Sequence, residues 1–103
     1  MAELELRQEG EVIWATMNRP DRLNALNRGL VKDLRDFFVD LYWRRDVRVV
    51  VLTGAGNAFC AGLDLKERTG GGNSERRSIG AGLTSQREIS EIVIAMRRCP
   101  QPI

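Results

Sequence analysis

A run of four apolar residues with no polar interruption, Val49–Leu52, constrains the fold of this chain more than any other feature. Strands with this pattern are usually covered on both faces, as in a parallel sheet with helices packed against it. The preceding segment, from about Asn27 to Arg45, repeats apolar residues at spacings of three and four, which is the period of an amphipathic helix. A helix that leads into a buried strand predicts an α/β architecture.

A β-hairpin is predicted before that helix. Leu4 and Leu6 alternate with charged residues, the pattern breaks at Gly10, and Val12–Met17 resumes it with β-branched and aromatic residues. The segment Asn18–Arg22 contains a proline between residues that tolerate tight bends, and it therefore predicts a turn that ends the strand pair.

The helix ends and a second helix can also be placed. Asn27 is suited to cap the first helix, and Arg44–Arg45 would complement the negative end of its dipole. A second helix is predicted over Ser85–Cys99, where Ser85 and Glu88 have the spacing of a capping box and Pro100 follows the end.

Composition restricts the size, location and partners of the chain. Its 103 residues, 43% hydrophobic and 29% charged, fit one globular domain. The net charge is only +2 and the signs are mixed along the sequence, so we expect no nucleic-acid surface. The N-terminus lacks a basic signal-peptide region, and the longest apolar run, Ile92–Met96, is far below the ~20 residues of a membrane span. We therefore expect a cytoplasmic protein without membrane contact.

The chain has no histidine and only two cysteines, Cys60 and Cys99. The absence of histidine excludes Ser-His-Asp and Cys-His nucleophiles and every His-ligated metal site. Because the chain has no histidine that could activate the Cys60 thiol, we interpret both cysteines as small core residues. Neither a metal nor a redox cofactor is expected.

Two further segments bear on the domain organisation. The segment Gly70–Arg77 starts with three consecutive glycines and has no apolar period, which predicts a mobile loop over about residues 68–84. At the other end, Pro100–Ile103 has the pattern of a lead into another strand. We therefore expect residues 1–103 to be a truncated part of one larger domain.

The most informative segment for chemistry is Phe59–Glu67, which passes from a strand end through Gly62 into residues suited to open a helix. Unpaired backbone N–H groups at such a junction can stabilise an oxyanion that forms on a thioester carbonyl. Small residues at Ala61 and Gly62 would let a flat ligand lie against the main chain. Spacing alone leaves an ordinary strand–turn–helix junction as the more frequent alternative.

A dinucleotide-binding loop is a second alternative at the preceding turn. Gly54 and Gly56 follow a hydrophobic strand, as in the Gly-x-Gly-x-x-Gly fingerprint, but the third glycine position is occupied by Phe59. The chain also lacks the Gly-Lys-Ser/Thr triplet of a P-loop. Phosphate binding of either kind is therefore disfavoured.

Three segments in order, Asn18–Leu26, Val49–Leu65 and Cys99–Ile103, resemble the crotonase superfamily, the enoyl-CoA hydratase/isomerase family. The resemblance implies an α/β spiral of ββα units, of which this chain would hold the N-terminal half. It also implies acyl-CoA as the substrate and a stabilised thioester enolate. No cofactor is implied, because coenzyme A is part of the substrate, and the expected assembly is a homotrimer or a dimer of trimers.

The resemblance also assigns roles to individual residues. The backbone N–H of Leu63 would be one donor of the oxyanion hole, whereas Asp64 is a weaker candidate that is better suited to cap the next helix. Arg22 would lie near a CoA phosphate or act as an ordinary turn residue. The residues implied for the substrate and CoA site are Arg22, Leu23, Asn24, Ala25, Ala61, Gly62, Leu63, Asp64 and Leu65.

The same resemblance limits what the chain can do alone. In the family, the second oxyanion donor and the acid–base groups lie beyond the motif at which this sequence stops. We therefore expect hydration of 2-enoyl-CoA, in fatty-acid or related acyl-CoA metabolism, as the activity of the complete enzyme and no turnover by these 103 residues. The alternatives are a non-catalytic CoA-binding or assembly module of the same family and a dinucleotide-binding half-domain.

Overall fold

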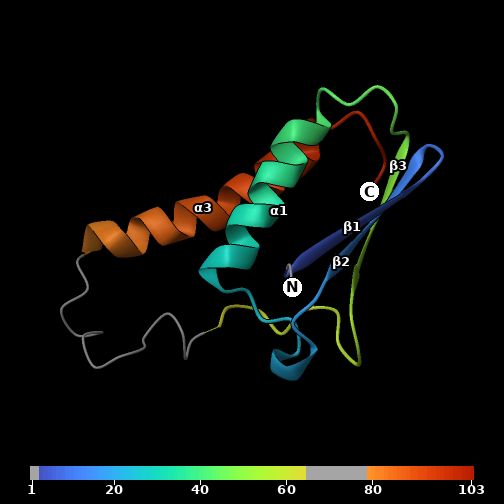
Figure 1. Ribbon diagram of the computed structural model, residues 1–103. Coiled ribbons are helices and arrows are strands. Elements are labelled where there is room, and N and C mark those ends of the chain that lie inside the picture. Colours follow the sequence, from blue (N-terminus) through green and yellow to red (C-terminus); the bar gives the residue numbers. More distant parts are fainter. Residues whose placement is uncertain (1–2, 65–78) are drawn as a thin grey trace.

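Two antiparallel strands open the fold, and a third lies parallel to the second, in the order β1-β2-β3 (Figure 1). The computed structural model describes residues 3–64 and 79–103, with side chains described for 3–64 and 87–103. The predicted hairpin is confirmed as β1, Leu4–Glu9, and β2, Val12–Met17. The apolar run lies in β3, Val49–Gly54, and its parallel pairing with β2 confirms the α/β prediction.

Helix α1, Arg28–Leu41, forms where the apolar period predicted it. Asn27 is its N-cap, because the Asn27 Oδ1 accepts a hydrogen bond of 2.8 Å from the Leu30 N–H. Its buried residues recur at spacings of three and four along one face. They are Leu30, Val31, Leu34, Phe38 and Leu41.

The end of α1 differs from the expectation. The helix stops at Leu41, so Arg44 and Arg45 lie beyond its last turn and do not complement its dipole there. The Arg44 guanidinium instead pairs with Asp46 at 2.7 Å. The carbonyl of Leu41, the last helical residue, accepts a hydrogen bond of 3.0 Å from the Nε2 of the buried Gln101, which also donates to the Arg44 carbonyl beyond the helix (2.8 Å).

Helix α3, Ile79–Arg98, begins six residues before the predicted start at Ser85. The capping box predicted at Ser85 and Glu88 is therefore wrong, because Ser85 lies inside the helix. Glycines at positions 80 and 82 concealed the first turn, since glycine is a poor helix former. Residues 79–84 are thus helical and do not belong to the predicted loop, whereas its remaining part, residues 68–78, lies outside the described residues.

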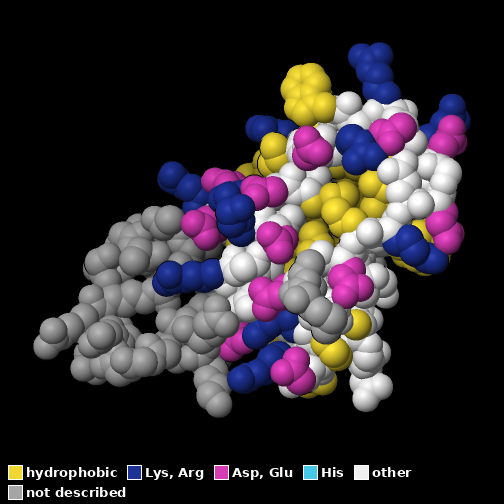
Figure 2. Space-filling view, viewed as in Figure 1, with side chains coloured by type: hydrophobic (Ala, Val, Ile, Leu, Met, Phe, Trp, Pro, Cys, Tyr) yellow, Lys and Arg dark blue, Asp and Glu magenta, His cyan; other side chains and the backbone are white. Residues whose placement is uncertain are grey.

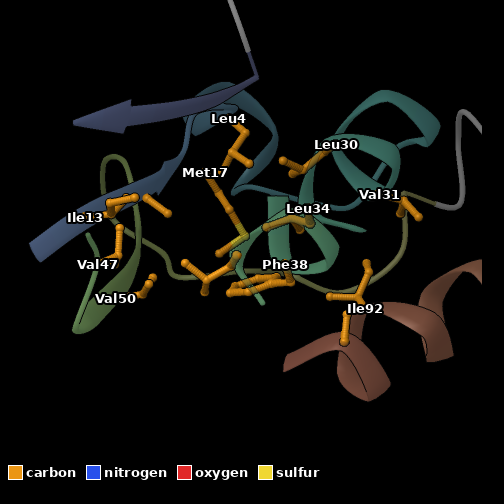
Figure 3. Packing of buried hydrophobic residues seen from close by; sticks show 13 residues of the cluster. Leu4, Ile13, Met17, Leu30, Val31, Leu34, Phe38, Val47, Val50 and Ile92 are labelled. Carbon is orange, nitrogen blue, oxygen red and sulfur yellow. The ribbon is translucent and has the colours of Figure 1, made fainter. Parts of the chain in front are cut away.

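The core lies between the sheet and the two helices, which are on the same side of it (Figure 1). Met17 from β2 and Phe38 from α1 meet at its centre, and Ile92 brings in α3 (Figure 3). Within the described ranges, no helix covers the other face of the sheet, where Val49 is 38% exposed. The expected coverage of β3 on both faces is therefore not found in this part of the chain.

The C-terminal residues return to the sheet. The Val50 N–H donates to the Pro102 carbonyl at 3.0 Å, which places the end of the chain beside the edge of β3 that does not face β2. The segment was predicted to lead into another strand, and it lies where such a strand would pair. None of the helices in the described ranges has the length and apolar character needed to cross a membrane.

Candidate functional site

Two loops that are far apart in the sequence meet near the N-terminus of α1 (Figure 1). Backbone hydrogen bonds join them: Ala61 N–H donates to the Leu23 carbonyl (3.0 Å), and Leu26 N–H donates to the Gly62 carbonyl (2.7 Å). A third bond runs from the Asp64 N–H to the Leu26 carbonyl (2.9 Å). The two segments in which the sequence placed substrate-binding residues are therefore held side by side.

The Leu63 N–H group is directed away from this junction. Leu63 forms a parallel bridge with Leu26, in which the carbonyl of Gly62 and the amide of Asp64 make the two hydrogen bonds. Backbone groups alternate in direction along an extended chain, so the polar groups of Leu63 itself point to the opposite side. No acceptor for the Leu63 N–H is found among the described residues. Within residues 3–64 and 79–103, the junction thus presents a backbone donor without an acceptor.

Gly62 allows the backbone conformation that directs the Leu63 N–H away from the junction. Its φ angle is +95°, which side chains of L-amino acids rarely allow, although a Cβ at this position would have free space. The Gly62 N–H lies 3.4 Å from the Sγ of Cys60, and Gly62 itself is exposed. An open backbone surface therefore precedes Leu63.

Asn24 fixes the other side of the junction. Leu23 and Asn24 both adopt left-handed φ angles, +53° and +58°, which are uncommon outside glycine. The Asn24 side chain is completely buried, and its Nδ2 donates to the carbonyls of Ala55 (2.9 Å) and Ala58 (2.7 Å). Its Oδ1 accepts from the Arg19 N–H (2.7 Å). Both amide protons are used, so this side chain holds the two loops together.

Gly54 is required at the end of β3 by close approach of the chain. A Cβ at this position would lie 2.4 Å from the carbonyl oxygens of both Ala58 and Phe59, and 2.7 Å from the Nδ2 of Asn24. The space beside Gly54 is therefore filled by the protein's own atoms. That observation argues against a pyrophosphate at the Gly54–Gly56 turn.

The Arg19 guanidinium lies beneath the junction with its side chain only 10% exposed. Its Nη2 is 3.0 Å from the Oδ2 of Asp64, whose side chain is 8% exposed, and its Nε is 3.2 Å from the Oε2 of Glu3. Its Nη1 also donates to the Ala25 carbonyl. Charge-assisted bonds in such a buried position are stronger than exposed ones.

The residues that the sequence suggested for the site differ in their exposure to solvent. Arg22 and Leu23 are exposed, as are Ala61 and Gly62, while Leu63 is half-buried. Asn24 points inward and is completely buried, backbone included, so it offers no surface to a ligand, contrary to its predicted place in the substrate and CoA site. Asn24, Ala25 and Asp64 are buried, and Leu65 lies outside the described residues.

Asp64 directs its carboxylate toward Arg19, a partner that sequence reasoning did not identify. The helix that Asp64 was predicted to cap would begin outside the described residues, so that role stays a prediction. Arg19 and Glu3 were missed as well, because both lie far from Asp64 in the sequence. The only local signal was the position of Arg19 before Pro20, which keeps the backbone of Arg19 out of the α-helical region.

Both cysteines pack against the core, which confirms their interpretation as small core residues. The Cys99 Sγ donates toward the carbonyls of Ala95 (3.2 Å) and Phe38 (3.3 Å). Burial raises the pKa of the Cys99 thiol above its usual value. A raised pKa leaves less thiolate at neutral pH, which makes Cys99 a poor nucleophile.

The rest of the visible surface carries charges of both signs in alternation, with an apolar area between them (Figure 2). A cavity of about 520 Å³ lies at the other end of α1, between α1 and α3. It is lined by Phe38, Val39, Tyr42, Trp43, Glu91, Ile94, Ala95 and Arg98. None of these residues was singled out as a site residue, and none belongs to the junction around Leu63.

Comparisons with known proteins point to one family. Residues 7–98 match the family model described as enoyl-CoA hydratase/isomerase. A probable enoyl-CoA hydratase echA12 from Mycobacterium leprae is 36% identical over 98 residues, which are 90% of this chain and 32% of the relative. The 1,2-epoxyphenylacetyl-CoA isomerase of Escherichia coli is 30% identical over 95 residues, covering 92% of this chain and 36% of that protein.

The solved structures agree. An enoyl-CoA hydratase/isomerase from Mycobacterium paratuberculosis superimposes with a TM-score of 0.83 at 32% identity, over 99% of this chain and 39% of that one. Pseudomonas aeruginosa AtuE gives a TM-score of 0.86 at 31% identity, over 96% of this chain and 37% of that one. The chain therefore spans little more than a third of the length of these proteins.

Proposed function

Because the chain belongs to the enoyl-CoA hydratase/isomerase family, we propose that it forms the acyl-CoA-binding part of such an enzyme, with the Leu63 N–H as one oxyanion donor. The resemblance to the crotonase superfamily and its fold class, both stated from the sequence, are confirmed by the family match and by the solved structures. The site itself, its substrate and its reaction are the proposal.

The direction of the Leu63 N–H is the observation that carries this proposal. The amide is free among the described residues, it lies beside the exposed backbone of Ala61 and Gly62, and its neighbours are fixed by hydrogen bonds to the opposite loop. A fixed donor of this kind stabilises negative charge that develops on a thioester oxygen, because it needs no reorganisation during the reaction.

The surrounding surface supports the binding of coenzyme A. Ala61, Gly62 and Leu23 are exposed at the junction, where the adenine and pantetheine would lie. Arg22 is exposed next to them and would approach a phosphate of the coenzyme. Asn24 and Ala25 are buried behind this surface and are not part of it.

In the complete enzyme, we propose, water adds across the C2–C3 double bond of a 2-enoyl-CoA while the thioester oxygen is held by Leu63. This chemistry belongs to fatty-acid or related acyl-CoA metabolism and uses no metal or redox cofactor. We further propose a cytoplasmic location and assembly as homotrimers or dimers of trimers. Loss of a single oxyanion donor costs about 2.7–4 kcal/mol of barrier, so one donor without acid–base groups is not enough for turnover.

A non-catalytic CoA-binding or assembly module is the second candidate. The two candidates share the same CoA surface and differ only in turnover. The dinucleotide-binding alternative is disfavoured, because Ala58, Phe59 and Asn24 fill the space beside Gly54.

Calorimetry with butyryl-CoA, free CoA and NAD⁺ tests the proposal. We expect butyryl-CoA to bind most tightly and NAD⁺ not to bind. The variant Leu63→Pro removes the proposed donor without breaking a hydrogen bond to any described residue, and it should lower the affinity for butyryl-CoA about tenfold. Leu63→Ala keeps the amide and is the matched control. Tighter binding of NAD⁺, or equal affinities for both variants, would overturn the proposal.

A further inference from the structure

We propose that Arg19 is a positioning residue that sets the direction of the Leu63 N–H, an inference that rests on the proposed function of that amide. The guanidinium contacts one residue on each side of the bridge between Leu26 and Leu63. Its Nη1 binds the carbonyl of Ala25, next to Leu26, and its Nη2 binds the carboxylate of Asp64, next to Leu63. One planar group thus clamps both strands of the bridge from the inside.

The clamp is itself held in place. Glu3 contacts the Arg19 Nε at 3.2 Å and also accepts a bond of 2.8 Å from the Nδ2 of Asn27, the N-cap of α1. The Arg19 N–H donates to the Oδ1 of the fully buried Asn24. The guanidinium is therefore oriented by the start of α1 through Glu3 and by the two loops through Ala25 and Asp64. A shift of any of these three segments would move it.

Burial excludes a direct role for Arg19 in binding. Its side chain is 10% exposed and that of Asp64 is 8% exposed, so neither charge is open to a CoA phosphate. Lysine could not replace this arginine, because an ammonium on a flexible stem lacks the planar fork that reaches two acceptors at fixed angles. Arg19 acts on the thioester only through the backbone that it holds.

The test compares two ligands that differ in one carbonyl group. Butyryl-CoA carries the thioester oxygen, whereas S-butyl-CoA is a thioether and offers no acceptor to Leu63. The ratio of their dissociation constants isolates the hydrogen bond from the rest of CoA binding. For the unchanged 103-residue chain we expect butyryl-CoA to bind about tenfold more tightly, the ratio for one well-formed bond.

Arg19→Lys should reduce this ratio to about two or less while the affinity for S-butyl-CoA stays within about twofold. Arg48→Lys is the matched control, because Arg48 has a side chain 77% exposed and pairs only at the surface with Glu11. It should keep the full ratio. A general loss of structure would weaken both ligands equally, whereas loss of positioning weakens only the thioester.

Asp64→Asn supplies the second test and decides the matter if Arg19→Lys does not fold. It keeps the size and one oxygen acceptor but removes the charge that holds the Arg19 Nη2, and the ratio should again fall. A folded variant of either residue that keeps the tenfold ratio overturns the proposal for Arg19. Absence of any preference in the unchanged chain would instead overturn the proposed function of Leu63.

Discussion

The Nδ2 of Asn24 lies 2.7 Å from the carbonyl oxygen of Ala58, 34 positions further along the chain. The same amide donates to the carbonyl of Ala55 and accepts from the Arg19 N–H, so one fully buried side chain joins the loop from Arg19 to Asn24 to the turn after β3. Buried backbone groups without partners are costly, and these loops satisfy part of theirs through Asn24. The arrangement of the candidate site depends on this contact.

Asn24→Ala should therefore lower the free energy of unfolding by about 2–4 kcal/mol, because it leaves buried carbonyls unpaired and removes the residue type that best tolerates a left-handed φ. Denaturant titration checks this. Asn57→Ala, at an exposed position of the adjoining turn, should change stability by less than about 0.5 kcal/mol. Equal effects of the two substitutions would contradict the role assigned to Asn24.

Gly54→Ala should also destabilise the chain, by about 2–3 kcal/mol, because the added Cβ meets two carbonyl oxygens and the Asn24 amide. Gly10→Ala is the comparison, since Gly10 has a φ of +60° but nothing within 4 Å of a Cβ. Its cost should be limited to about 1 kcal/mol of backbone strain. Thermal or denaturant unfolding of both variants measures the difference, and a larger cost at Gly10 would disprove the close approach at Gly54.

Asp46 should titrate well below the usual range of an aspartate. The hydrogen bond from Arg44 is the main cause that lowers the pKa of this carboxyl in the folded chain, and the hydrogen bond from Gln8 is the second. A pKa lowered by folding stabilises the protein above the unfolded value of about 4, and that contribution is lost as the pH falls through the folded pKa. Side-chain NMR titration follows the group directly, and Arg44→Met should move its midpoint upward. An unchanged midpoint would disagree with the observed pairing.

The purified 103-residue chain should not hydrate crotonyl-CoA, because the proposed mechanism needs a second oxyanion donor and acid–base groups in addition to Leu63. A spectrophotometric assay on a sample of verified mass measures this. A relative that contains the whole domain serves as the positive control. Hydration by the short chain at an enzymatic rate would refute the division of labour proposed above.

Local patterns were enough to place most secondary structure. The alternation in Val12–Met17, the apolar period of α1 and the cap at Asn27 each depend on residues close in sequence, and all three were predicted correctly. The start of α3 was predicted wrongly. The spacing of Ser85 and Glu88 also fits a helix interior, and glycine weakens the sequence signal of the first turn. Element ends depend on contacts that a local window does not contain.

Some features of the candidate site could be predicted from the sequence and others could not. A backbone donor at Leu63 was expected from the junction and from the family resemblance, and the Leu63 amide has no acceptor among the residues that the structure describes. Its role in an oxyanion hole stays a prediction. Two features of the site were not predicted: the inward direction of Asn24 and the pairing of Arg19 with Asp64. Both depend on contacts between residues 31 to 45 positions apart. Such contacts follow from the parallel placement of β3 beside β2, which only the folded chain establishes.

The Leu63 amide itself can be observed by ¹H–¹⁵N NMR. In the free chain it should exchange with solvent faster than the amides of Leu26 and Asp64, which donate to internal carbonyls. Butyryl-CoA should shift its proton resonance downfield, and S-butyl-CoA should leave it unchanged. An amide already protected without ligand, or unmoved by a bound thioester, would contradict the account.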